Sequence, residues 1–157
     1  MTSDEIVRLL EQYSAGIDAE LTLLAQLAAV ARHQHEVSQA SDFVAFTNIA
    51  DTRDSLMRSL VTIEDGLRPI RQALADHRDL ASRIAGYDDV VRRHREAAQL
   101  VTAILATDQQ SIGALADAEL ARRSAVASLE RGETTLAAYR RVLSPPIASA
   151  SLVDKIG

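Results

Sequence analysis

The apolar residues of this chain recur at alternating steps of three and four, the spacing that places side chains on one face of a helix. The most regular run consists of Phe46, Ile49, Arg53, Leu56, Leu60, Ile63, Leu67, Ile70 and Leu74. A seam of about four heptads predicts a long helix with coiled-coil character that packs along other helices. Gly66 and Pro69 lie within this run, and we expect them to kink the helix rather than end it.

A second apolar stripe begins close to the N-terminus. Ser3 precedes Asp4 and Glu5, so a hydroxyl that can cap a helix is followed by two acids in its electropositive first turn. The stripe itself comprises Ile6, Leu10, Tyr13, Ile17, Leu21, Leu24, Leu27 and Val30. It predicts a first helix of roughly 35 residues, about 50 Å long. Ser41 and Asp42 then predict the start of the second helix.

The segment from Val90 to Leu143 contains no proline, which predicts a third helix roughly 80 Å long. Such a helix is longer than either partner. It therefore either extends beyond them, alone or paired with another molecule, or breaks near Gly113, which follows a polar stretch. Pro145 and Pro146 end any helix, because proline lacks the backbone donor and clashes with the preceding turn.

The connection between the second and third helices has two interpretations. Leu80, Ile84 and Tyr87 either extend the second helix or form a short helix of their own. In both cases Gly86 is the expected C-cap, and Asp88 with Asp89 marks the next helix start.

The fold class predicted from these stripes is all-α. No segment alternates apolar and polar residues over more than about four positions, as a half-buried strand would. We expect an antiparallel bundle of long helices with coiled-coil character and a very long third helix. Residues 1–143 form the expected helical bundle domain, and residues 144–157 a flexible C-terminal tail.

Composition excludes several function classes. The net charge of −5 argues against nucleic acid, whose phosphates need a basic surface. Without cysteine there is neither a disulfide framework nor thiolate chemistry. The acidic, amphipathic start is unlike a signal peptide. No run of 18 apolar residues exists, so we expect no insertion into a membrane.

No arrangement of residues predicts catalysis, a cofactor or a metal. His33 and His35 are two positions apart, whereas a zinc pair on one helix needs a spacing of four. His77 stands alone, and His94 lies in a charged stretch that is typical of a solvated helix face. We therefore expect a protein without enzymatic activity, cofactor or bound metal.

Arg53 is the one charged residue in the most regular seam, and it has two interpretations. Its stem can pack in the seam while the guanidinium reaches solvent. Alternatively, the charge is paired and fixes the register of the helices or binds a partner.

Three features together resemble a known family. They are the leucine-rich first helix, the heptad run "FTNIADTRDSLMRSLVTIEDGLRPIRQAL", and the long third helix that ends in a proline-broken tail with Asp154 and Gly157. This combination, covering most of the chain, resembles the FlgN-type flagellar export chaperones. The resemblance implies an all-helical cytoplasmic protein that holds hook-associated proteins, the hook–filament junction proteins, before type III secretion.

The resemblance also implies where partners bind. The client is the amphipathic terminal helix of a junction protein, and the export apparatus is a second expected partner. Helix-in-groove recognition uses anchors at i, i+3, i+4 and i+7. The expected partner-binding residues are Val126, Leu129, Leu136, Tyr139, Leu143, Ile147 and Leu152. The alternative is a structural coiled-coil or adaptor protein that forms a permanent homodimer through its third helix.

Overall fold

The computed structural model describes the helices of residues 1–130 and the side chains of residues 1–123. Four helices make up this part of the chain: α1 (Ser3–Gln39), α2 (Phe43–Asp76), α3 (Arg78–Ala81) and α4 (Tyr87–Glu130). Residues 1–130 contain no strand. The prediction of an all-helical protein whose helices pack against one another is therefore confirmed. The predicted tail, residues 144–157, lies outside the described residues.

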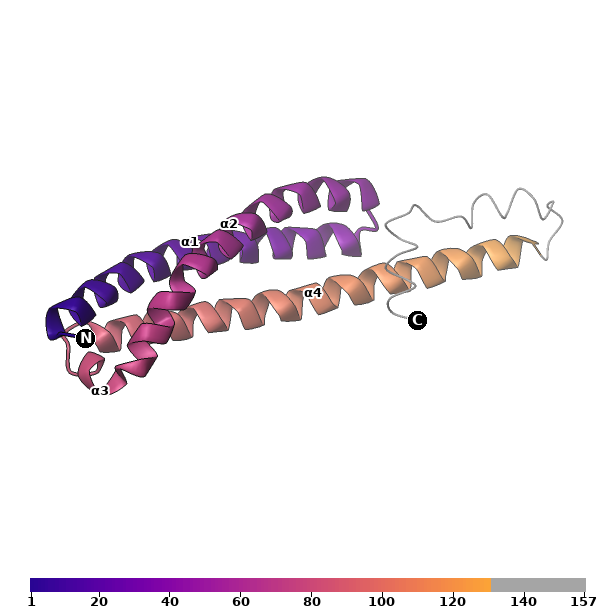
Figure 1. Cartoon of the computed structure of the whole chain (residues 1–157). Helices are drawn as coiled ribbons and strands as arrows, with labels where there is room; N and C mark the ends of the chain where they lie inside the picture. The colour runs from indigo at the N-terminus through magenta and orange to yellow at the C-terminus, as the bar shows by residue number, and fades with distance from the viewer. Residues whose placement is uncertain (131–157) are drawn as a thin grey trace.

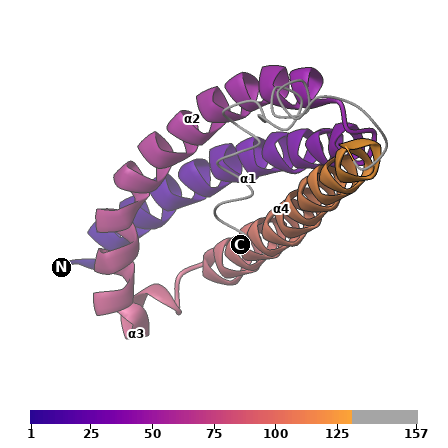
Figure 2. The same cartoon turned by 90° about the vertical axis from the view of Figure 1, so that its right-hand side faces the viewer.

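Helix α1 is the central element of the fold. It has extensive contacts with both α2 and α4, whereas α2 and α4 make at most marginal contact with each other. The chain runs along α1, turns back along α2, and after α3 runs along α4 in the direction of α1 (Figures 1 and 2). Each outer helix therefore depends on α1 for its packing.

The helix starts follow local capping chemistry. Thr2 caps α1: the backbone N–H of Glu5 donates to the Thr2 hydroxyl, and the Glu5 carboxylate accepts from the Thr2 backbone N–H. The prediction of Ser3 as the cap was wrong by one residue, because only Thr2 has a glutamate at the third helical position to form this reciprocal pair. Asp42 caps α2 as predicted, accepting from the N–H of Ala45.

The buried face of α1 is one continuous seam. Its spacing alternates between four and three along the whole helix, through Ile6, Leu10, Tyr13, Ile17, Glu20, Leu24, Leu27, Ala31, Gln34 and Ser38. The predicted stripe held Leu21 and Val30, which are only half-buried. The seam instead includes Glu20 and Gln34, because its period is constant even where the sequence supplies polar side chains.

Helix α2 is continuous through Gly66 and Pro69. It is curved, as both views show (Figures 1 and 2), and Pro69 removes one of its backbone hydrogen bonds. Of its seam only Leu67 and Leu74 are buried. The other seam residues are half-buried, because α1 covers α2 from one side only.

The connection to α4 resolves the two sequence alternatives. The short helix α3 contains Leu80, whereas Ile84 follows it and Tyr87 begins α4. The prediction of Gly86 as the C-cap was wrong, because α3 ends at Ala81 with Ser82 as its C-cap. Gly86 adopts a φ of +93°, a conformation that suits glycine, directly before α4. Helix α4 is unbroken through Gly113, so the alternative of a break there is wrong. With 44 residues against 37 in α1, it extends beyond its partner (Figure 1).

By length and composition alone, α1 could cross a membrane. The buried core helix of a folded protein passes the same test. In this fold the α1 seam is covered by α2 and α4 and contains Glu20 and Gln34. The absence of membrane insertion stays a prediction.

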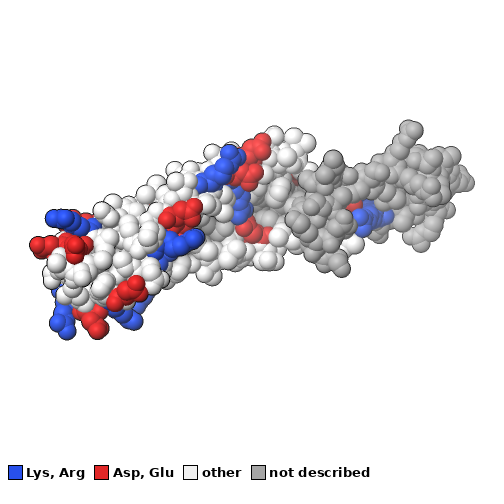
Figure 3. Space-filling model, in the orientation of Figure 1, with Lys and Arg blue, Asp and Glu red and all other residues white. Residues whose placement is uncertain are grey.

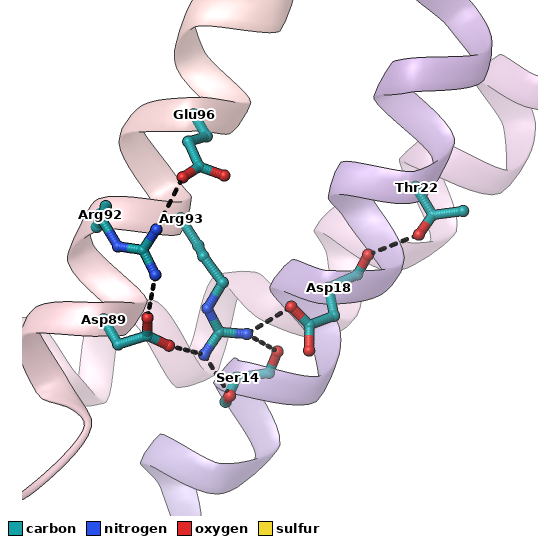
Figure 4. Close-up of polar contacts among 7 residues, drawn as sticks. All are labelled: Ser14, Asp18, Thr22, Asp89, Arg92, Arg93 and Glu96. Atoms are coloured by element: carbon teal, nitrogen blue, oxygen red, sulfur yellow. Dashed lines mark hydrogen bonds and ion pairs between the residues drawn. The ribbon is translucent and has the colours of Figure 1, made fainter.

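Arg93 joins the first turns of α4 to α1 (Figure 4). Its guanidinium donates to the backbone carbonyl and the hydroxyl of Ser14 and pairs with Asp18 and Asp89. The Arg93 side chain is 14% exposed, whereas the neighbouring Arg92, which pairs with Asp89 and Glu96 on its own helix, is 65% exposed. Arg93 is therefore an interhelical contact and Arg92 a surface one.

We expect Arg93→Met to lower the free energy of unfolding by about 2 kcal/mol, because it leaves polar groups of Ser14 and Asp18 without their partner. Arg92→Met should change it by less than about 0.5 kcal/mol. Urea denaturation of both variants measures the difference. Equal losses would mean that Arg93 contributes nothing beyond a surface ion pair.

Gly16 allows a close approach of α1 and α2. A Cβ at this position would lie 2.3 Å from Cδ2 and 3.1 Å from Cγ of Leu67, which is buried. Gly66, inside α2, has nothing within 4 Å of the corresponding point. The two helical glycines therefore differ in whether packing requires them.

Gly16→Ala should destabilise the protein by about 1 kcal/mol, since overpacking of Leu67 outweighs the better helix propensity of alanine. Gly66→Ala should stabilise it by roughly 0.5–1 kcal/mol through propensity alone. Thermal melting of both variants gives the two signs. A gain from Gly16→Ala would show that Leu67 moves aside at little cost.

Candidate functional site

The most distinctive surface of the described chain is the side on which α2 and α4 flank α1 without packing on each other. We call it the open face. Along it polar side chains connect the two outer helices above the buried α1 seam. On the face seen in Figure 3, charged side chains gather in clusters separated by uncharged surface.

Tyr13 is the centre of one polar network on the open face. Its hydroxyl accepts from Nε of Arg71 on α2 at 3.1 Å and lies 3.2 Å from Nδ1 of His94 on α4. The Arg71 guanidinium also lies over the Tyr13 ring, 5.6 Å from its centroid, and donates twice to Glu64. One α1 side chain thus connects all three long helices, and His94 is not the purely solvated residue that the sequence predicted.

Glu20 lies in the α1 seam beside this network. It is 7% exposed, and among the described residues its one ion-pair partner is Arg71, 4.0 Å away. Burial, and then the neighbouring Glu64 carboxylate, raise the pKa of Glu20 to about 7. The bidentate contact from Arg71 and the hydrogen bond from Glu20 lower the pKa of Glu64 to about 2. At neutral pH Glu64 is therefore ionised and Glu20 is about half protonated.

The pKa of Glu20 predicts a pH dependence of stability. From its ordinary value of 4.5 up to about 7, the folded state binds more protons than the unfolded chain, so the free energy of unfolding falls as pH rises. Glu20→Gln should match the parent near pH 4.5 and exceed its stability by about 3 kcal/mol at pH 7.5. Urea melts across this range measure the slope.

The matched control for this experiment is Glu11→Gln, which removes one exposed carboxylate from the same helix. Glu64 adds stability that is lost only as pH falls from 4.5 towards 2, so it does not interfere. An unchanged slope between pH 4.5 and 7.5 in Glu20→Gln would contradict the assignment.

A second polar connection lies further along the open face. Arg53 on α2 donates to both carboxylate oxygens of Asp108 on α4, at 2.6 and 2.5 Å, and to the buried Gln34 of α1 at 2.9 Å. The Arg53 and Asp108 side chains are 21% and 25% exposed. Of the two interpretations of Arg53, the structure supports the paired charge that fixes register, and not the one in which its head reaches solvent freely.

Replacing Arg53 by leucine should cost about 2 kcal/mol, because Asp108 and Gln34 lose their common partner. The double variant Arg53→Leu/Asp108→Leu should cost less than the two single variants added together. Denaturant melts of the four proteins give the coupling energy. A neutral or stabilising Arg53→Leu would contradict the register role.

A pocket of about 280 Å³ lies at one end of the open face, near α3; we call it the end pocket. It has an apolar floor and walls from all three long helices, with two arginines and a histidine among its lining. These residues are Leu10, Tyr13, Arg71, Leu74, Ala75, Arg78, Tyr87, Val90, Val91 and His94.

Exposed apolar side chains continue from the end pocket along α2. Met57 lies one heptad before Glu64, so both occupy the same side of α2, the side that reaches towards Tyr13. Val61 follows one turn later and is 55% exposed. Met57 and Val61 line a shallow hollow on this helix.

The opposite edge, on α4, has a matching pair. Val101 lies midway between His94 and Asp108, one heptad from each, and therefore on the side that faces α2. Leu105 lies one turn later and is 60% exposed. The apolar residues of both helices thus occupy the stretch between the Tyr13 network and the Arg53–Asp108 pair.

The described residues contain no group of three histidine, aspartate or glutamate side chains that could hold a metal ion. His33 is exposed and His77 lies at the end of α2. On the open face Arg53 pairs with Asp108, and Arg71 pairs with Glu64. What this arrangement can do chemically is bind another surface, through apolar contacts ordered by charges.

The structure tests little of the partner-binding set predicted from sequence. Val126 and Leu129 lie on α4, but their side chains are outside the described residues. Leu136, Tyr139, Leu143, Ile147 and Leu152 lie outside them altogether. The open face was not predicted, although Met57 and Val61, two large apolar residues beside the α2 seam, were a signal for it.

No family model matches the chain, and comparison with curated proteins and with solved structures found no match either.

Proposed function

We propose that this protein is a flagellar type III export chaperone. In this function it holds the amphipathic terminal helix of a hook–filament junction protein in the cytoplasm, catalyses no reaction, and hands its client to the export apparatus. The proposal originates in the family resemblance of the sequence. The single observation that supports it best is the open face, where two helices flank a third and leave apolar side chains exposed.

An amphipathic helix suits this surface physically. Helix-in-groove recognition places the apolar face of a helix against apolar side chains of the receptor. Met57 and Val61 of α2 supply such side chains on one side, and Val101 and Leu105 of α4 on the other, above the buried α1 seam. We further propose that the three long helices form an antiparallel bundle with coiled-coil packing, to which the client adds a fourth helix.

The alternative function, a permanent homodimer through α4, also has an observation in its favour. Helix α4 extends beyond α1, and Leu120 in its distal part is 62% exposed. Mass photometry at nanomolar concentration separates the two. A permanent dimer keeps twice the chain mass on dilution. The chaperone should instead be a monomer on dilution, or become one when client peptide is added.

The chaperone proposal predicts that a synthetic peptide of a junction protein's terminal helix, from the same genome, binds the purified protein. Leu105→Glu should weaken this binding at least about tenfold, equivalent to ~1.4 kcal/mol, because it places a charge on the apolar wall. Isothermal titration measures both affinities.

Ala106→Glu is the matched control, since this neighbouring exposed residue lies on the opposite side of α4 from the open face. It should leave the affinity within about twofold of the parent. Circular dichroism melts establish that both variants fold. Absence of peptide binding to the parent protein would refute the chaperone proposal.

A further inference from the structure

The end pocket is large enough to hold one large side chain. Its volume of about 280 Å³ lies just below the range of about 300–1,000 Å³ typical of small-molecule sites. Leu10, Leu74 and Val90, all buried, form its apolar interior. The pocket can therefore take one large apolar side chain from a partner.

The charged side chains that line the end pocket are two arginines, Arg71 and Arg78, and no carboxylate is among the lining residues. Arg71 is already engaged by Glu64 and by the Tyr13 hydroxyl. Arg78 is exposed and forms no ion pair with any of the described residues. Its charge is thus the one at the pocket that a partner's carboxylate can neutralise.

The end pocket is continuous with the rest of the open face. Arg71 lies two heptads after Met57 on α2, and Val91 two heptads before Leu105 on α4, so each pair shares one side of its helix. A helix lying between α2 and α4 would therefore present its terminal turns to the pocket. A free small molecule in the pocket would not contact the rest of the open face.

We propose that the end pocket receives one large apolar side chain of a partner helix, and that Arg78 binds an aspartate or glutamate one turn away on that helix. An acid three or four residues from the apolar anchor lies on the same helix face, which is what this geometry requires. The inference rests on the proposed function in taking the partner to be a helix, and it adds that the client is acidic beside its anchor.

The test uses two blocked, alanine-based helical peptides, each with one leucine. Four residues after the leucine, one peptide has glutamate and the other lysine. Methyl NMR spectra of the full-length protein follow Leu74, Val90 and Val91 in the end pocket during titration. We expect the glutamate peptide to shift these methyl signals and to bind at least about fivefold more tightly than the lysine peptide.

Arg78→Glu should reverse this preference, so that the lysine peptide binds better. The matched control is Arg83→Glu, an exposed arginine outside the pocket lining, which should preserve it. Glutamate at the first position of α3 suits a helix N-terminus, so the variant is expected to fold, as circular dichroism can verify.

The inference would be overturned by the absence of methyl shifts in the pocket, by equal affinity for the two peptides, or by a preference that survives Arg78→Glu. Shifts caused by octanoate but not by the glutamate peptide would identify a site for a free apolar acid instead of a helix, and would also overturn it.

The same spectra separate this inference from the proposed function. If the junction-protein peptide binds but leaves Leu74, Val90 and Val91 unshifted, the chaperone function holds and the pocket assignment fails. If the glutamate peptide binds as expected and the junction-protein peptide does not bind, the pocket assignment holds and the flagellar function fails.

Discussion

The packing of α1 between α2 and α4 is the interaction on which the rest of this structure depends. Because the backbones of α2 and α4 lie close at few points, if any, most of the packing of each is against α1, and the Arg53–Asp108 pair connects them directly. A seam that alternates steps of four and three over the whole helix makes this possible. Three mutually packed helices would share their apolar surfaces equally, and no open face would remain.

Polar residues within the seam determine where the outer helices sit. Apolar contacts alone would allow one helix to shift along another by a heptad, since the shifted leucines would make similar contacts. Gln34 of α1 and Asp108 of α4 both bind Arg53, and Tyr13 binds both Arg71 and His94, so each set fixes one register of three helices. The cost is the burial of Glu20, whose raised pKa records how poorly that carboxylate is solvated.

Helix positions were predictable from the sequence, because period and capping are local properties. The Asp42 cap and the extent of α1 follow from residues a few positions apart. The open face was not predictable, since hydropathy gives each helix an apolar stripe without saying which helix covers it. Arg53 shows the limit well: its partner Asp108 is 55 residues away, and only the packing brings them together.

The open face also limits what kind of partner can bind. Fully burying an exposed aliphatic side chain contributes about 1.5–3 kcal/mol, and the four apolar residues between the polar networks are already partly covered. The summed contribution of these four side chains is similar to the roughly 4–15 kcal/mol that association costs in lost translational and rotational freedom. Contact with this stretch alone would therefore be weak. On the inference above, a partner that binds tightly also fills the end pocket and pairs with Arg78 on α3, which makes its sequence, and not apolarity alone, the basis of selection.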